Sequence, residues 1–213
     1  GGYNVTTTPR EVKASQNGVS PEEAQGIYGE KGLSVWGGLV GEEYLQALKP
    51  WSREVRVYLE MRDDVTVGTL LDALKLPLLA ADFSVPPLSD SPQDEAAAEF
   101  LLANLHGMHR QTWRSFVSDT LESLDFGWAV NEIILEKRAD GRLWLRNIDP
   151  RGQETLNRWE LDENDTPTHM VQGQFRTGGP TDWRYIPLDK CVHIAWRGRK
   201  GNPQGKALLR SLY

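Results

Sequence analysis

A basic, glycine-rich segment near the end of the chain is the first candidate for chemistry, reading GRKGNPQGK over residues 198–206. A phosphate-binding P-loop has the form GxxxxGK[ST], in which backbone amides hold the phosphates and a hydroxyl binds magnesium. Here the glycine before Gly205 lies one position too close, Pro203 removes an amide donor and Ala207 replaces the hydroxyl. We therefore reject a nucleotide site.

The same segment could still contact phosphate or an acidic partner, with a solvated loop as the simpler alternative. The side chains that would make this contact are Arg197, Arg199, Lys200 and Lys206.

Acidic and histidine side chains could support metal-dependent hydrolysis, but their spacing matches no known arrangement. Glu132 and Glu136 would share one face of a predicted strand, and residues 162–167 begin like a calcium loop but carry Pro167 where glycine is needed. The sequence contains no HExxH, CxxC or GxSxG motif. We predict no catalytic residue, metal or cofactor. A hydrolase remains an alternative, and it would use Asp63, Asp64, Glu132 or His193.

The one cysteine, Cys191, alternates with His193 on a predicted strand, so the two would share a face. A nucleophilic thiol requires an orienting base and an activating environment, and neither is indicated. We interpret Cys191 as a small buried thiol. A single cysteine excludes an internal disulfide and fits a reducing compartment.

Eight tryptophans are a high count for 213 residues. We interpret them as rigid anchors in the core and in interfaces. The alternative is a binding module whose tryptophans lie on one face and hold a carbohydrate or peptide. Their positions are scattered: 36, 51, 113, 128, 144, 159, 183 and 196.

The overall composition is that of an ordinary globular protein, 39% hydrophobic and 25% charged, with a formal net charge of -6. That charge argues against a dedicated nucleic-acid clamp, although DNA could still pass the protein. No apolar run approaches the ~20 residues that span a bilayer, and the first residues do not form a signal peptide. We expect the sequence to be a fragment, with residues missing before Gly1 and after Tyr213.

Helices are predicted through the first half of the chain. A helix starts near Arg53, and another has Thr66 as its N-cap and is ended or bent by Pro77. A third is capped by Ser91 and reaches about Leu105. Further helices are predicted at 42–48, at 110–125 and after Gly205.

After Gly127 the apolar residues recur at every second position, which predicts strands. An Asp-Gly turn at 140–141 joins the first two strands into a hairpin, and 177–180 is a later turn. The strand ranges are 128–137, 142–148, 155–161, 169–175, 183–186 and 191–196.

This order predicts an α+β fold, with a helical N-terminal part followed by an antiparallel β-rich layer. Residues 1–50 are predicted to form an arm, either wrapped on a neighbouring subunit or floppy, and residues 51–213 to form the main domain.

Taken together, these elements resemble the portal proteins of tailed bacteriophages, nearest the Mu-like portal family. The resemblance covers roughly residues 53–213 and rests on the order and spacing of several segments. They are YLEM at 58–61, DFSVPP at 82–87, FGWAVNEI at 126–133, DGRL at 140–143, IDPR at 148–151, IPLDKCVH at 186–193 and GNPQGKALLR at 201–210.

The resemblance implies a structural, non-enzymatic subunit of a ring, usually of about twelve copies, at one capsid vertex through which double-stranded DNA is packaged and ejected. It implies that residues 51–213 are the wing domain, without the stem, clip and crown. The implied partners are other copies of the chain, the major capsid or scaffold protein, the terminase motor, a head-tail adaptor and the passing DNA, with no membrane. The implied location is the virion, after assembly in the host cytoplasm.

Overall fold

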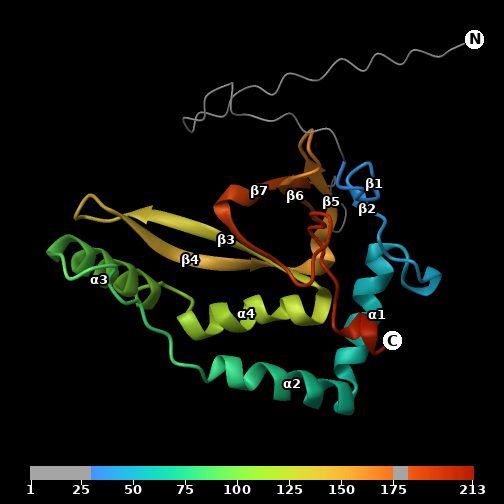
Figure 1. The fold of residues 1–213 in the computed structure, drawn as a ribbon, viewed down its shortest axis with the longest axis horizontal. Helices are drawn as coiled ribbons and strands as arrows, with labels where there is room; N and C mark the ends of the chain where they lie inside the picture. The colour runs from blue at the N-terminus through green and yellow to red at the C-terminus, as the bar shows by residue number, and fades with distance from the viewer. Residues whose placement is uncertain (1–29, 175–181) are drawn as a thin grey trace, which may run out of the picture. The chain divides into compact units, whose positions relative to one another are not determined.

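The computed structural model describes residues 30–174 and 182–213, and residues from Leu33 onward form one compact unit. Four α-helices precede two antiparallel sheets, which confirms the predicted α+β class (Figure 1). The predicted arm falls largely outside the described residues, as does the predicted turn at 177–180. The division at residue 50 stays a prediction.

Local capping explains where the helices begin. Ser91 accepts a hydrogen bond from the backbone N–H of Asp94, and Thr112 accepts one from that of Ser115. These caps satisfy donors that the first helical turn cannot pair. The helices are α1 (Trp51–Asp63), α2 (Val65–Leu79), α3 (Pro92–His106) and α4 (Trp113–Phe126).

The strands form two three-stranded sheets. The first has the order β4-β3-β8 and the second the order β5-β6-β7, with antiparallel pairing throughout. Gly141 adopts a φ of +77° in the predicted Asp-Gly turn between the first two strands of the first sheet. The strands are β3 (Trp128–Lys137), β4 (Leu143–Arg151), β5 (Leu156–Leu161), β6 (Pro167–Gln174), β7 (Asp182–Pro187) and β8 (Cys191–Ala195).

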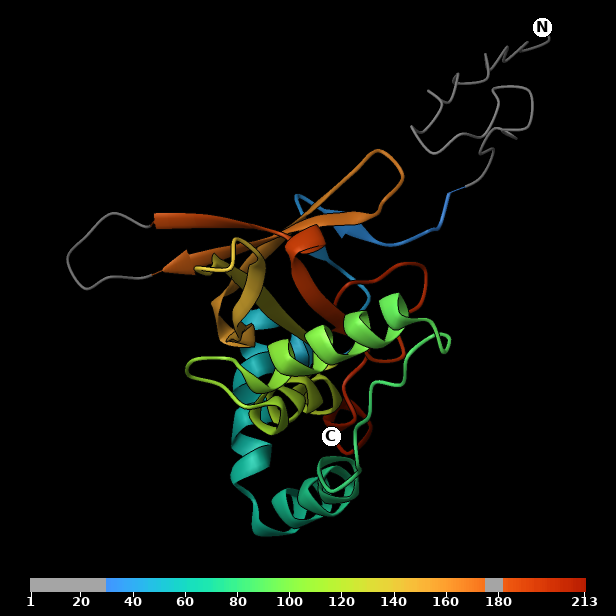
Figure 2. The ribbon, with the colours of Figure 1, turned by 90° about the vertical axis from the view of Figure 1, so that its left-hand side faces the viewer.

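Three hydrophobic clusters hold these layers together, because each sheet face or helix stripe must be covered. Trp128, Trp159 and Met170 fill the space between the two sheets. Another cluster joins α1, α2, the end of α4 and residues 207–209. The third lies between α4 and the outer face of β3 and β4 (Figure 2).

The segment before α1 is mostly irregular. It contains a two-stranded hairpin, β1 (Val35–Trp36) and β2 (Leu39–Val40), and a short 3-10 helix η1 (Gln46–Leu48). The helix predicted at 42–48 is therefore wrong except for this last turn. The hairpin packs on β5, since the N–H of Trp159 donates to the carbonyl of Gly38 over 2.9 Å.

Other sequence predictions need local correction. Asp64, rather than Thr66, caps α2, because its carboxylate accepts from the N–H groups of Thr66 and Val67. Pro77 does not end α2, which continues to Leu79. The helix predicted after Gly205 is only a 3-10 turn, η4 (Leu209–Ser211). The two errors on α2 lie at its boundaries, where cap chemistry can be supplied by more than one residue.

Candidate functional site

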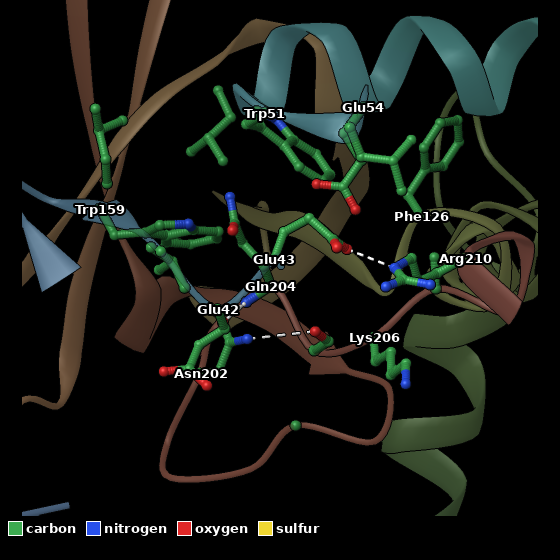
Figure 3. A pocket seen from close by; sticks show the side chains of 18 of the residues that line it. Glu42, Glu43, Trp51, Glu54, Phe126, Trp159, Asn202, Gln204, Lys206 and Arg210 are labelled. Atoms are coloured by element: carbon green, nitrogen blue, oxygen red, sulfur yellow. Dashed lines mark hydrogen bonds and ion pairs between the residues drawn. The ribbon is translucent and has the colours of Figure 1, made fainter. Parts of the chain in front are cut away.

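A cavity of about 1000 Å³ lies among the described residues, and besides Phe126 and residues 156–159 three segments line it. These are residues 38–44 after β1, the start of α1, and the loop 197–210 that follows β8 (Figure 3). All four basic residues singled out from the sequence line it: Arg197, Arg199, Lys200 and Lys206.

The cavity has an aromatic and apolar floor. Trp51, Leu48, Phe126 and Trp159 contribute to it, and Leu48 and Trp159 are almost wholly buried. Trp51 is fixed because its Nε1–H donates to the carbonyl of Gln153 over 3.2 Å. Of these four side chains only Trp51 is partly exposed, so its ring is the one that an apolar group entering the cavity would meet.

Two of the inner carboxylates are neutralised by neighbouring cations. Glu43 Oε2 lies 2.6 Å from Nε of Arg210, and Glu42 Oε2 lies 3.5 Å from Nζ of Lys200. Burial opposes ionisation of Glu43, but hydrogen bonds from Arg210 and from the Leu45 N–H outweigh it and lower the Glu43 pKa. These pairs tie the segment before α1 to the loop after β8.

The third carboxylate, Glu54, has no such cation in contact. Tyr58 Oη donates to Glu54 Oε1 over 2.7 Å. Desolvation nevertheless raises the pKa of Glu54 to about 7, because the charged form is poorly solvated there. Glu54 can therefore hold a proton near neutral pH.

The charge of the cavity is opposite to that of the chain. Seven basic and three acidic side chains line it, whereas the whole chain carries a net charge of -6. Beyond the four predicted residues, the basic side chains are Lys49, Arg158 and Arg210. The site can attract negatively charged groups to an otherwise acidic protein.

Two glycines allow the loop 197–210 to pack closely on the junction between α4 and β3. Gly127 has φ +91° and Gly205 has φ +56°, a region that favours glycine. A Cβ on Gly127 would lie 2.5 Å from the carbonyl oxygen of Gln204. The N–H of Trp196 donates to the carbonyl of Gly127, and that of Lys206 to the carbonyl of Trp196, both over 2.7 Å. Sequence reasoning missed this close approach, although the glycine at the start of a strand was its signal.

The acids proposed for hydrolysis do not form one site. Asp64 is used as the cap of α2, and Glu132 forms an ion pair with Arg151. A register shift between Ile134 and Leu135 interrupts the alternation that would place Glu136 beside Glu132. Glu136 instead pairs with Arg138 and His109. Among the residues that the structure describes, no group of three or more His, Cys, Asp or Glu could hold a metal ion.

Cys191 and His193 lie on β8, opposite β3. Desolvation, reinforced by the nearby Glu132 carboxylate, raises the pKa of the Cys191 thiol to about 11, so the thiolate is disfavoured. Burial lowers the pKa of His193, whose Nε2 lies 2.9 Å from the carbonyl oxygen of Pro203. His193 helps to place the loop, and Cys191 lacks the activation that a nucleophile needs.

The tryptophans do not form a common binding platform. Trp128 and Trp159 are buried between the sheets with ring centroids 5.1 Å apart. The exposed ones, Trp36, Trp183 and Trp196, belong to different segments. The anchoring role predicted from the sequence therefore holds for the inner pair.

No helix in the described part of the chain is long and apolar enough to cross a membrane. A family model described as the portal protein of Mu bacteriophage matches residues 55–213, three quarters of the chain. The matched region includes the α4–β3 junction, both sheets and the loop after β8. No curated protein matches the chain.

Proposed function

The chain belongs to the family of Mu bacteriophage portal proteins, and from this premise we propose that it is a subunit of a ring at one vertex of the capsid. The ring contains about twelve copies, and double-stranded DNA is packaged and ejected through it. The single observation that carries this proposal is the family match over residues 55–213.

The packing of the chain suits such a structural role. Buried aromatic side chains fix the two sheets against each other. Of the carboxylates considered for catalysis, Asp64 is engaged in a helix cap and Glu132 in an ion pair. A ring subunit needs a rigid shape and stable contacts with its neighbours, because its work is positional. The protein acts without enzymatic turnover, and residues 51–213 correspond to the wing.

The proposed location and partners follow from the same role. The protein is a virion component that assembles in the host cytoplasm and contacts the major capsid or scaffold protein. The terminase motor and a head-tail adaptor bind the same ring at different stages. The net charge of -6 lets DNA pass without tight binding, since like charges repel.

Two other functions, a metal-dependent hydrolase and a tryptophan-based binding module, have less support. The described residues contain no cluster suited to a metal, and their two most buried tryptophans lie between the sheets.

Electron microscopy of the purified full-length protein tests the proposal. We expect closed rings with rotational symmetry and a central opening. Single subunits or open filaments in every preparation would contradict it, as would loss of a substrate-hydrolysing activity on replacement of Asp64 or Glu132.

A further inference from the structure

We propose that the basic cavity receives the connection between α2 and α3 of the neighbouring copy. The connection comprises residues 80–91, and the start of α3 follows it. This inference rests on the proposed ring and identifies the surfaces by which consecutive subunits join.

The cavity has the features of an acceptor surface in a protein interface. Two aromatic side chains are highly exposed: Trp36 is 87% exposed and Tyr44 79%. Both precede α1, and Tyr44 lines the cavity together with the basic residues. Trp, Tyr and Arg are the residue types that dominate the binding energy of protein interfaces. An occupant with an apolar anchor and negative charge would complement this site.

The α2–α3 connection offers that combination. Leu88 is 94% exposed, the highest value among the large hydrophobic side chains of the described residues. Asp90 follows it, Glu95 lies in the first turn of α3, and Glu99 lies one turn further along the helix. All three carboxylates are exposed, and none forms an ion pair within the described part of the chain.

The two surfaces lie at opposite ends of the compact unit. In Figure 1, α3 occupies one end, and β1, β2 and the start of α1 occupy the other. One copy therefore cannot place its own connection in its own cavity. Contact between unlike surfaces on successive copies is heterologous, and such contacts generate a closed ring when the rotation between copies allows it.

A protein segment fits the cavity better than the DNA backbone does. The exposed surface of Tyr44 and the partly exposed ring of Trp51 can pack against a leucine side chain, whereas a phosphate backbone offers no apolar group to cover them. The basic rim then matches the carboxylates that follow Leu88 along the chain.

Charge reversal on each surface tests the contact. We expect Lys206→Glu with Arg199→Glu, and separately Asp90→Lys with Glu95→Lys, to raise the concentration for half-assembly at least about tenfold. Combining all four substitutions should restore much of the assembly, because opposite charges face each other again. Matched controls are Arg56→Glu with Arg114→Glu and Glu60→Lys with Asp72→Lys, on exposed positions outside both surfaces. These should leave assembly unchanged.

Cysteine cross-linking gives an independent measurement of the same contact. In a Cys191→Ser background, Tyr44→Cys and Leu88→Cys in one chain should give a ladder of multimers on oxidation. A mixture of the two single variants should give dimers only. Val65→Cys, which replaces a side chain that is 83% exposed elsewhere on α2, should give no ladder when paired with Tyr44→Cys.

The outcomes separate this inference from the proposed ring itself. If rings form, but neither charge reversal weakens them and no ladder appears, the assigned contact is wrong while the ring function stands. If the unmodified protein does not assemble at all, the proposed function fails. If reversal at Lys206 and Arg199 lowers duplex DNA binding and leaves assembly intact, the cavity is a DNA contact and the inference is overturned.

Discussion

The junction between α4 and β3 differs from the cavity beside it in how its charged side chains are paired. At the junction, Asp125 is fully buried, with Lys75 Nζ at 2.6 Å and Arg62 Nε at 3.5 Å. In the cavity, Arg199 and Lys206 are exposed, without an ion pair in the described part of the chain. The Asp125 carboxylate is paired with cations of its own subunit, whereas the charges of Arg199 and Lys206 remain available to a partner.

This difference separates residues that specify the fold from residues that can serve assembly. A buried carboxylate requires partners, because an unpaired charge in the interior is strongly destabilising. An exposed cation contributes little to folding and can change without loss of structure. Variants at the junction should therefore lower stability, and variants at the cavity rim should change assembly alone.

The largest effect is expected at Gly127, where the backbone of the junction meets the loop. Gly127→Ala should lower the free energy of unfolding by about 4 kcal/mol, because positive φ disfavours alanine and its Cβ would press on the Gln204 carbonyl. Gly141→Ala is the matched control: φ is +77°, but nothing lies within 4 Å of the added Cβ. It should cost only about 1 kcal/mol. Urea denaturation measures both variants, and an equal loss in the free energy of unfolding would show that the close contact at Gly127 is unimportant.

Removal of the buried carboxylate should have the next largest effect. Asp125→Ala leaves Lys75, whose side chain is 15% exposed, without its anion, and should destabilise the fold by about 3 kcal/mol. Asp72→Ala, on the exposed face of α2, should change stability by less than about 0.5 kcal/mol. Thermal unfolding of the two variants measures the difference, and similar midpoints would argue against a structural role for Asp125.

Glu54 lies at the boundary between the two regions and should make stability depend on pH. Its ordinary pKa of 4.5 is raised to about 7 in the fold. The unfolded chain therefore loses this proton at lower pH than the folded chain, and stability falls as pH rises from about 4.5 to 7.

Glu54→Gln should remove this dependence and be more stable than the unmodified protein above pH 7, by about 3 kcal/mol. Below pH 4.5 the two proteins should be equally stable, because Glu54 is then protonated in both states. If the free energies of unfolding of the two proteins differed by the same amount at every pH, Glu54 would not be desolvated in the fold.

The smallest effect on folding is expected at the cavity rim. Arg199→Glu and Lys206→Glu should each change the free energy of unfolding by less than about 0.5 kcal/mol, because both side chains are exposed. Chemical denaturation under conditions that keep the protein monomeric measures this directly. A decrease of several kcal/mol in the free energy of unfolding at either position would show that the cavity rim, like the junction, is needed for folding.

The sequence was sufficient to predict the fold class and most elements. The 3.6-residue period predicted α4, and the change of period at Gly127 placed β3 at its observed bounds. The helix predicted at 42–48 failed because tertiary contacts decided this stretch. Leu48 is buried against α1, and Glu42 and Glu43 turn toward cations far along the chain.

The candidate site was only partly predictable from the sequence. Four basic residues close together along the chain drew attention to the loop, and all four line the cavity. The aromatic floor was not predictable, because Trp51 and Trp159 come from distant segments that only the tertiary fold brings together. The raised pKa of Glu54 likewise depends on burial that the sequence does not show.

The mass distribution of the purified full-length protein, measured across micromolar concentrations, tests the proposed self-assembly most directly. We predict one dominant species of about twelve subunits in equilibrium with monomer. A single monomeric species at every concentration, also in the presence of its capsid partners, would contradict the account.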